Sequence, residues 1–407
     1  MSVISDLCSV YTTWGALHSY LTSEAGGSLR IDDHSTPENP FALIRYVKGK
    51  SNMSLAHVRA FRSVVWDVLD NRPVSVTSFK SEDGETLPTG PVENFCVEPF
   101  HDGVMIGVFF DKYSDSWRIH TRSTLDANCR YYSQSKTFRQ MFDEAGVDYS
   151  RFNKGASYTY VLQHPENRIV VPVVKPQAIL VDTALLEPSG AVSFVKSLAL
   201  PVISWDIVRM MLADLNGRFG YNIQGYVVKD NATSKRYKIR TSEYNRVRKV
   251  RGNSARRDFL WLNAWQAGTL RDYLTLFPEE RVESDAVINR WKRVTNDVFH
   301  IYTDVFKARS LPKTSIPPKY RPLVYGIHSL YLDTLKPANK SVDWRSVLGY
   351  MNNRDTAQML FVINWESRQA ATQLGVPSIP IEPSTTVGTE VTATVADAPA
   401  TTVAEVA

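Results

Sequence analysis

Residues 100–124 read FHDGVMIGVFFDKYSDSWRIHTRST, and this stretch decides the fold that we expect for the chain. It holds two runs rich in β-branched and aromatic residues, VMIGVFFD and WRIHTRS, separated by polar residues. Runs of this composition and length are typical of β-strands. The Asp-Gly pair before the first run, Asp102 and Gly103, would by itself indicate only a turn.

Runs of the same kind continue between Arg62 and Arg240. They are SVVWDV, YTYVLQ, RIVVPVV, AILVD, GYVV and RYKIR, with Gly, Pro, Asn and Asp between them. Two helical stretches, 136–145 and 205–216, interrupt the strands. The body of the chain is therefore expected to be α+β.

The hydrophobic period changes after Phe259. Apolar residues then recur at steps of three and four, as on one face of a long helix: Val287, Trp291, Val294, Val298, Ile301 and Val305. A second helical stretch is expected at about 344–373. The period predicts an all-helical domain after the α+β body, and packing is the simplest role for the apolar face.

Four regions follow from this organisation. They are an N-terminal segment (1–60) in which no motif is recognised, the body (61–257), the helical domain (258–374) and a tail (375–407). From Val376 onward the tail has no aromatic and no basic residue. Such a composition cannot bury enough surface to offset the entropy of ordering, so the tail is expected to be disordered.

The composition suggests a globular protein of the cytoplasm or nucleus that is not secreted. No run approaches the roughly 18 apolar residues of a membrane span, and the first residues lack the basic-then-apolar order of a signal peptide. The cysteines Cys8, Cys96 and Cys129 are far apart and form no CxxC pair, which favours neither disulfides nor zinc. The eight histidines show no ligand spacing, so we assign no metal site.

Positive charge is concentrated in one segment. Residues 229–257 hold eleven Lys and Arg against two acidic residues, a local charge of +9, whereas the whole chain carries +5. Two tyrosines, Tyr237 and Tyr244, lie among these cations. Such a segment is more typical of contact with a polyanion than of a loop that is merely solvated.

Four segments, in this order and spacing, resemble the T4 RNA ligase 1-like branch of the covalent nucleotidyltransferases, including divergent ligase-like proteins of large DNA viruses. FRSVVWDV (61–68) is similar to the family's Arg-Gly strand, and residues 100–124 to its Lys-x-Asp-Gly motif with the hairpin that follows. YVLQHPENRIVVPV (160–173) is similar to the Pro-x-Asn-Arg-Ile-Val element. QGYVV (224–228) and RYKIR (236–240) are similar to the Glu-Gly and Lys-x-Lys strands. The resemblance implies a nucleotidyltransferase body of antiparallel strands with flanking helices.

The resemblance also implies a chemistry. A lysine amine attacks the α-phosphate of ATP to form lysyl-AMP, and the AMP then passes to an RNA 5′-phosphate. Carboxylates hold the divalent metal, and further cations hold the phosphates. ATP and Mg²⁺ are the cofactors, and RNA the partner, that this resemblance implies.

Only the cationic half of such a site is present in this sequence. Phe100 stands where the family has its nucleophilic lysine, and Val161 and Gln224 stand at carboxylate positions. The residues that the resemblance assigns to nucleotide binding are Arg62, Asp102, Gly103, Arg122, Lys238 and Arg240. Arg246, Arg248, Lys249 and Arg251 are the candidate contacts to nucleic acid.

Three functions remain open on the sequence. The first is an RNA ligase-like protein that binds RNA ends, single-stranded or nicked, and possibly ATP without forming lysyl-AMP. The second is an active ligase with a displaced nucleophile, for which Lys80 and Lys112 flank the motif but lack its spacing, or one that acts only on pre-adenylylated RNA. The third is a structural or partner-binding protein. His101 and His164 lie beside motifs, but a structural or surface role is the default for single histidines.

Overall fold

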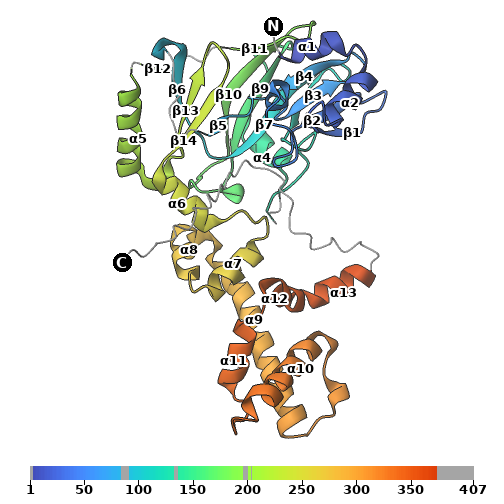
Figure 1. Ribbon diagram of the computed structural model, residues 1–407, viewed down its shortest axis with the longest axis vertical. Helices are drawn as coiled ribbons and strands as arrows, with labels where there is room; N and C mark the ends of the chain where they lie inside the picture. Colours follow the sequence, from blue (N-terminus) through green and yellow to red (C-terminus); the bar gives the residue numbers. More distant parts are fainter. Residues whose placement is uncertain (1–2, 84–90, 133–135, 196–199, 203, 374–407) are drawn as a thin grey trace, which may run out of the picture. The chain divides into compact units, whose positions relative to one another are not determined.

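The computed structural model describes residues 3–83, 91–132, 136–195, 200–202 and 204–373, and these form two compact units (Figure 1). The first unit holds residues 3–130 and 136–241 of this range, and the second holds residues 131–132 and 242–373. The expected tail lies outside the described residues. Within them, no helix has the length and apolar character that crossing a membrane requires.

The first sheet of the first unit is antiparallel and includes the N-terminal segment. Its strands, in order across the sheet, are β1 (Arg30–Asp33), β2 (Phe41–Arg45), β3 (Val64–Asp67) and β4 (Arg72–Val76). A core that includes Ile4, Leu17 and Trp66 packs this sheet against the first helices. These are α1 (Val3–Val10), α2 (Trp14–Thr22) and α3 (Ala56–Ala60). Residues 1–60 therefore do not stand apart from the body as expected, because β1 and β2 pair with β3.

The second sheet is also antiparallel and contains the hairpin expected at 100–124. Its order is β11 (Val192–Phe194), β10 (Gln177–Leu186), β9 (Ala156–Gln163), β7 (Val104–Asp111) and β8 (Ser116–His120). Helix α4 (Phe138–Glu144) begins in a capping box, in which Thr137 and Gln140 each satisfy the other's backbone N–H. Its buried Phe142 packs edge-on against Tyr160 of β9.

The third sheet positions the candidate site. Its order is β12 (Leu200–Pro201), β6 (Phe95–Pro99), β13 (Gly225–Asp230), β14 (Arg236–Arg240) and β5 (Glu82–Asp83), with only the short β5 pairing in parallel. One face is apolar: Phe95, Val97 and Val228 form a core with Val208 of helix α5 (Trp205–Phe219). Because side chains alternate along a strand, the residues between these point to the opposite face.

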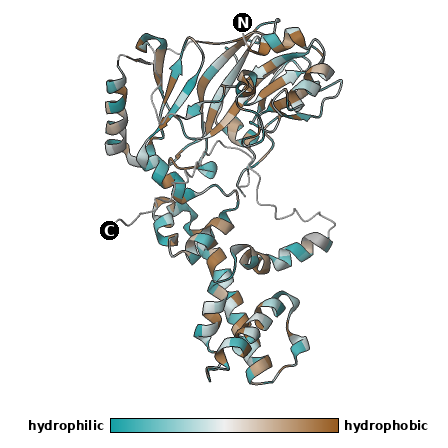
Figure 2. Ribbon diagram, viewed as in Figure 1, coloured by the Kyte–Doolittle hydropathy of each residue, from teal (hydrophilic) through white to brown (hydrophobic). Residues whose placement is uncertain are grey.

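The second unit is all helical, as the change of period predicted. Its helices are α6 (Ser242–Arg251), α7 (Arg257–Gln266), α8 (Leu270–Leu276), α9 (Arg281–Tyr302), α10 (Arg321–Leu330), α11 (Trp344–Asn352), α12 (Thr356–Ile363) and α13 (Trp365–Gln373). The predicted apolar stripe of α9, with Val287, Trp291, Val294 and Val298 buried, packs against α7, α10, α11 and α12. Figure 2 shows hydrophobic and hydrophilic residues interleaved along these helices. The α+β class with a helical C-terminal region is thus confirmed.

The boundary between the two units falls between Thr241 and Ser242, earlier than the expected boundary after residue 257. The physical reason is the packing of α6, which lies against α8 of the helical unit. Strand β14 ends at Arg240, and the basic segment 229–257 is therefore divided between the units.

Candidate functional site

The polar face of the third sheet carries four cations at alternating positions. Strand register aligns Lys229 with Arg236 and Val227 with Lys238, while Gly225 is aligned with Arg240. Directly paired residues share a face of a sheet, so the four cations share this one. Sequence reasoning identified Lys238 and Arg240 but missed Lys229 and Arg236. The signal was available, because Arg236 lies two residues before Lys238 on the same strand.

Phe100 occupies one end of this face. Its backbone N–H donates to the carbonyl of Gly225 at 2.9 Å, which continues the pairing of β6 with β13. The ammonium nitrogen of Lys238 lies 5.3 Å from the centre of the Phe100 ring, and the guanidinium carbon of Arg240 lies 5.1 Å from it. Both distances are within the range of a cation–π interaction. Lys238 and Arg240 thus share one aromatic neighbour, and their contact with a nucleotide stays a prediction.

Gly225 allows the strands to approach at this end. It has φ of +142°, and a Cβ here would lie 2.0 Å from the carbonyl oxygen of Ile239. No side chain can be accommodated at that distance. The Gln-Gly element of the sequence therefore has a steric requirement for glycine, whatever ligand the face binds.

Asp102 and Gly103 join the third sheet to the second. The Asp102 carboxylate is buried and accepts hydrogen bonds from the backbone N–H groups of Val170 and Val171, each at 2.9 Å. The backbone carbonyl of Asp102 accepts a hydrogen bond from the side chain of Gln163 at 2.6 Å. A Cβ on Gly103 would lie 2.3 Å from the carbonyl oxygen of Leu162 in β9. The second and third motif segments are therefore fastened together here. Contact of these two residues with a nucleotide stays a prediction.

Arg122 lies against the backbone of Arg62. The Arg122 guanidinium donates to the carbonyls of Arg62 at 3.4 Å and Tyr46 at 2.9 Å, and it stacks 4.5 Å from the Tyr46 ring centre. These contacts position Arg122 after the second-sheet hairpin. The structure thus places Lys238 and Arg240 around one ring, and Arg122 against the backbone of Arg62. Convergence of these four cations on one phosphate stays a prediction.

The carboxylate positions of the resemblance do not fit a protein-held magnesium ion. Val161 lies on β9 with an apolar side chain, and Gln224 is 5% exposed, with an amide oxygen that has no hydrogen-bond partner among the described residues. The carboxylate of Asp102 is already engaged by two N–H groups. Across the described part of the chain, no group of three or more His, Cys, Asp or Glu could hold a metal ion. We therefore assign no step to a metal.

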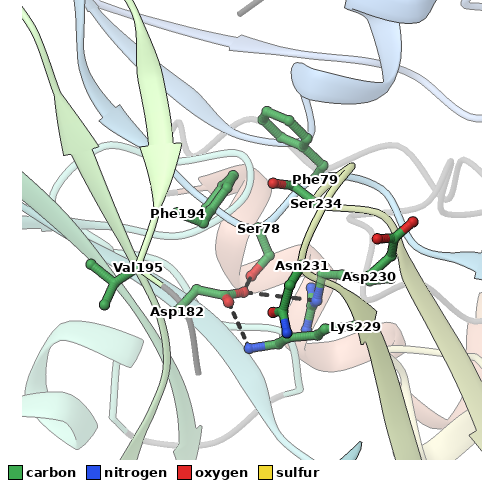
Figure 3. Close-up of a pocket in the computed structure, with 10 residues that line it drawn as sticks. Ser78, Phe79, Asp182, Phe194, Val195, Lys229, Asp230, Asn231 and Ser234 are labelled. Carbon is green, nitrogen blue, oxygen red and sulfur yellow. Dashed lines mark hydrogen bonds and ion pairs between the residues drawn. The ribbon is translucent and has the colours of Figure 1, made fainter. Parts of the chain in front are cut away.

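At the opposite end of the polar face, an ion-pair network joins the third sheet to the second sheet (Figure 3). The Lys229 ammonium lies 2.7 Å from Asp182 on β10 and 2.7 Å from Glu98 on β6, and Arg236 lies 3.8 Å from Asp182. Ser78 also donates to Asp182. Burial alone would raise the pKa of Asp182, but Arg236 and Lys229 hold it below the ordinary value.

A cavity of about 330 Å³ opens beside this network. It is lined by Glu98, Pro99, His101, Leu180, Val181, Asp182, Thr183, Val195 and Lys229. Burial lowers the pKa of His101, although the nearby Glu98 opposes the shift. The cavity is therefore lined by apolar side chains and by an ion pair that is already satisfied internally.

His164 has a structural role. It is 3% exposed, and its Nδ1 accepts the N–H of Glu166 at 3.1 Å. Its Nε2 therefore carries the proton and donates to Glu144 at 2.9 Å. These contacts hold the turn of the Pro-x-Asn-Arg element.

The two lysines considered as displaced nucleophiles are both engaged. Lys112 lies 3.1 Å from the buried Asp67 and also pairs with Asp70. Partial burial would lower the pKa of Lys112, but its hydrogen bonds to Asp70 and Asp67 outweigh burial and raise it. The Lys80 ammonium donates to the carbonyl of Ser81 at 3.1 Å. Because its ion pairs favour the protonated form, the Lys112 amine is poorly suited to attack phosphorus.

Helix α6 separates the candidate nucleic-acid contacts by face. Arg246 and Lys249 are exposed, with Arg246 paired to Glu243 at 2.9 Å, and Arg248 is half-buried. Arg251 is instead 2% exposed and pairs with the buried Glu280 at 2.6 Å, so its prediction as a nucleic-acid contact is wrong. The helical period explains the difference.

The inward face of α6 is marked by Tyr244, Val247 and Arg251, at steps of three and four. Around the Arg251 pair, Glu280 also accepts from Trp261 and Tyr273, at 2.8 and 2.7 Å. The sequence contained this signal, because Arg251 falls on the same stripe as two apolar residues.

The comparisons with known proteins point to ligases. No protein-family model matches the chain. A 100-residue stretch is 28% identical to an RNA ligase of Rhodothermus phage RM378, covering 21% of this chain and 22% of that protein. The chain is therefore similar to an RNA ligase over part of its length. This match confirms the resemblance expected from the motifs, although it spans only about a fifth of the relative.

Solved structures similar to this one are also ligases. They include an archaeal ATP-dependent RNA ligase in two forms, at TM-scores of 0.41 and 0.40 and identities of 12% and 13%. The match to form 1 covers 90% of this chain and 99% of the form 1 chain. The match to form 2 covers 72% of this chain and 83% of the form 2 chain. A putative ATP-dependent DNA ligase from Aquifex aeolicus has a TM-score of 0.34 and 14% identity, over 62% of this chain and 69% of its own. At such TM-scores, no functional residue is carried over from these structures.

Proposed function

We propose that this RNA ligase-like protein binds RNA ends, single-stranded or nicked, without forming lysyl-AMP. The observation that carries the proposal is the Phe100 ring, which lies against both Lys238 and Arg240. A phenyl ring cannot act as a nucleophile. The two cations beside it lie two residues apart on β14, a spacing suited to holding phosphate oxygens.

The same arrangement favours recognition by cations over recognition through a metal. Val161 and Gln224 supply no carboxylate, while Lys238 and Arg240 supply positive charge at a site that is buried or half-buried. Charge-assisted hydrogen bonds to phosphate strengthen when water is excluded. A nucleoside triphosphate or an RNA 5′-phosphate is therefore expected to bind weakly, and without a requirement for magnesium.

An active ligase with a displaced nucleophile has less support. Lys112 is held by Asp67 and Asp70, and Lys229 lies between Glu98 and Asp182. Each would have to lose an ion pair before its amine could react. Transfer from pre-adenylylated RNA does not need a lysine nucleophile, and it remains the enzymatic alternative to be tested.

Incubation with ATP labelled at the α-phosphate tests the proposal. We expect no acid-labile label on the protein, with or without magnesium, because loss of a covalent nucleophile alone costs on the order of a million-fold in rate. The Phe100→Lys variant should remain unlabelled, because the metal-side carboxylates are missing as well. Stoichiometric labelling of any lysine in the wild-type protein would overturn the proposal.

A parallel reaction separates the enzymatic alternative. Pre-adenylylated RNA is mixed with an acceptor that has a 3′-hydroxyl, and joined product is measured by gel electrophoresis. Absence of product agrees with a binding protein. Joining that is lost in Arg240→Met would instead establish a ligase that uses only the last chemical step.

A further inference from the structure

The helical unit contains a second basic segment that the sequence analysis did not separate from the rest of the chain. Between Lys307 and Lys340 there are seven Lys and Arg and one acidic residue, Asp333, which gives 7 − 1 = +6. The segment runs from the end of α9 through α10 to the start of α11 (Figure 1). Two π-helical turns, Thr303–Lys307 and Tyr331–Leu335, extend α9 and α10. Such turns are rare and are frequent at functional sites.

Aromatic rings from the two helices stack at these π-helical turns. Tyr302 stacks on Phe306 with ring centres 5.2 Å apart, and Phe306 stacks on His328 at 4.0 Å. His328 in turn stacks on Tyr331 at 6.0 Å, with the planes inclined by 26°. Tyr325 meets the edge of Phe306 at 6.3 Å. Tyr302, Phe306, His328 and Tyr331 therefore form one continuous series of stacked rings, and Tyr325 meets it edge-on.

The stack begins in the core and ends in solvent. Tyr302 is 2% exposed, Phe306, His328 and Tyr331 are half-buried, and Tyr325 is 42% exposed. A cluster that served packing alone would be expected to bury its rings throughout. Burial, and then the Lys313 cation, lower the pKa of His328. At neutral pH its ring is uncharged and suited to stacking.

One exposed cation lies over a ring of the stack, and two more exposed cations follow ring residues closely in the chain. The Lys313 ammonium lies 5.5 Å from the centre of the Phe306 ring. Lys336 is exposed and lies one π-helical turn after Tyr331. Its backbone N–H donates to the backbone carbonyl of Tyr331 at 2.8 Å. Arg309 is exposed three residues after Phe306. Aromatic faces interleaved with cations match the bases and phosphates of a single strand.

We propose that this stacking surface, made of Phe306, Arg309, Lys313, Tyr325, His328, Tyr331 and Lys336, binds single-stranded RNA through its bases and backbone. Because stacking and phosphate contacts read neither sequence nor the chemistry of the end, binding here is independent of the 5′ group. The proposal extends the proposed function, and it rests on that function only in taking RNA as the partner. A solvated basic surface over an ordinary aromatic core is the alternative.

The test measures the affinity of the full chain for single-stranded RNA, with either a 5′-phosphate or a 5′-hydroxyl, at several salt concentrations. Arg309→Ala/Lys313→Ala/Lys336→Ala should reduce the slope of log affinity against log salt by about 2, at roughly 0.7 per phosphate contact. The matched control, Arg290→Ala/Lys292→Ala/Arg293→Ala, removes three exposed cations from α9. We expect this control to retain most of the slope.

Stacking is tested separately from charge. Tyr325→Leu keeps an apolar side chain without a ring, and a roughly fivefold or greater loss of affinity is expected for a stacked base. Phe361→Leu is the control, because Phe361 is also 42% exposed in the same unit. Thermal unfolding of every variant verifies that the helices are intact.

Each outcome decides a different question. Equal effects of the two triple variants, or no effect of Tyr325→Leu beyond its control, would overturn the stacking surface. A third variant, Arg246→Ala/Arg248→Ala/Lys249→Ala, measures the contribution of α6 to RNA affinity separately from that of the stacking surface. If wild-type protein does not distinguish 5′-phosphate from 5′-hydroxyl, recognition of ends fails, yet the stacking surface can still be judged from its own variants.

Discussion

The two ends of the polar face of the third sheet carry the same kind of charge in different surroundings. At one end, Lys229 and Arg236 lie against the carboxylate of Asp182. At the other end, Lys238 and Arg240 lie against the ring of Phe100. Both pairs come from one hairpin, β13 and β14, only a few residues apart.

All four side chains are positively charged, so charge alone does not tell a structural cation from a candidate ligand-binding one. Their neighbouring side chains differ, and these indicate the role of each. A buried carboxylate compensates an ammonium fully and leaves it little attraction for a phosphate. An aromatic face contributes about 0.5 to 2 kcal/mol and carries no net charge of its own. The Lys229 end is therefore expected to serve stability, and the Phe100 end to serve binding.

The largest expected effect is on stability at the Lys229 end. Lys229→Met should lower the free energy of unfolding by up to about 3–5 kcal/mol, because it leaves the half-buried Glu98 and the largely buried Asp182 without their shared cation. Denaturant unfolding measures this change. Lys154→Met is the control, since Lys154 is 62% exposed and pairs with the exposed Asp115. A surface pair contributes about 1 kcal/mol or less, so similar losses in the two variants would contradict the comparison.

Lowering the pH should reduce stability through a second buried group, His120, and in a different pH range from Asp182. His120 is fully buried, and burial lowers its pKa to about 4 from 6.5. The unfolded chain therefore takes up a proton below pH 6.5 while the folded chain does not. Stability is complete above pH 6.5 and falls by about 3 kcal/mol as the pH decreases to 4.

Asp182 acts in a lower pH window. Its pKa is lowered in the folded protein, so its contribution is present above the ordinary value and is lost as pH falls below about 4. Asp182→Asn should therefore change the pH dependence of stability only in that lower window. Denaturant unfolding of both proteins from pH 7 to 3 measures the two windows. If Asp182→Asn instead reduced the loss of stability between pH 6.5 and 4, that loss would not come from His120.

A smaller effect is expected on binding at the Phe100 end. Lys238→Met and Arg240→Met should each weaken binding of an RNA 5′-phosphate roughly 10- to 100-fold, the value of a charged hydrogen bond. Arg236→Met, on the same strand, should leave that affinity unchanged. Titration with 5′-phosphate and 5′-hydroxyl RNA measures the difference. An equal loss in Arg236→Met would mean that the two ends of the face do not differ in function.

Much of the fold could be predicted because it depends on local patterns. Runs of β-branched and aromatic residues identified the strands around Asp102, and the three-four period identified the buried face of α9 from Val287 to Val298. Both patterns repeat within a few residues, so they are visible without knowledge of the partner element. The Asp-Gly and Gln-Gly elements were recognised through the resemblance, and the structure shows that each places glycine where a backbone carbonyl leaves no room for a Cβ.

Contacts between distant segments decided the rest. The sequence by itself determined the α+β body, the helical C-terminal region, the resemblance to ligases and the phenylalanine before Asp102 and Gly103. Only the tertiary structure decided that Arg251 is buried against Glu280, that Asp182 meets Lys229 from another sheet, and that rings of α9 and α10 form one stack. The physical reason is that a residue's charge is local, whereas its burial and its partner depend on segments tens of residues away.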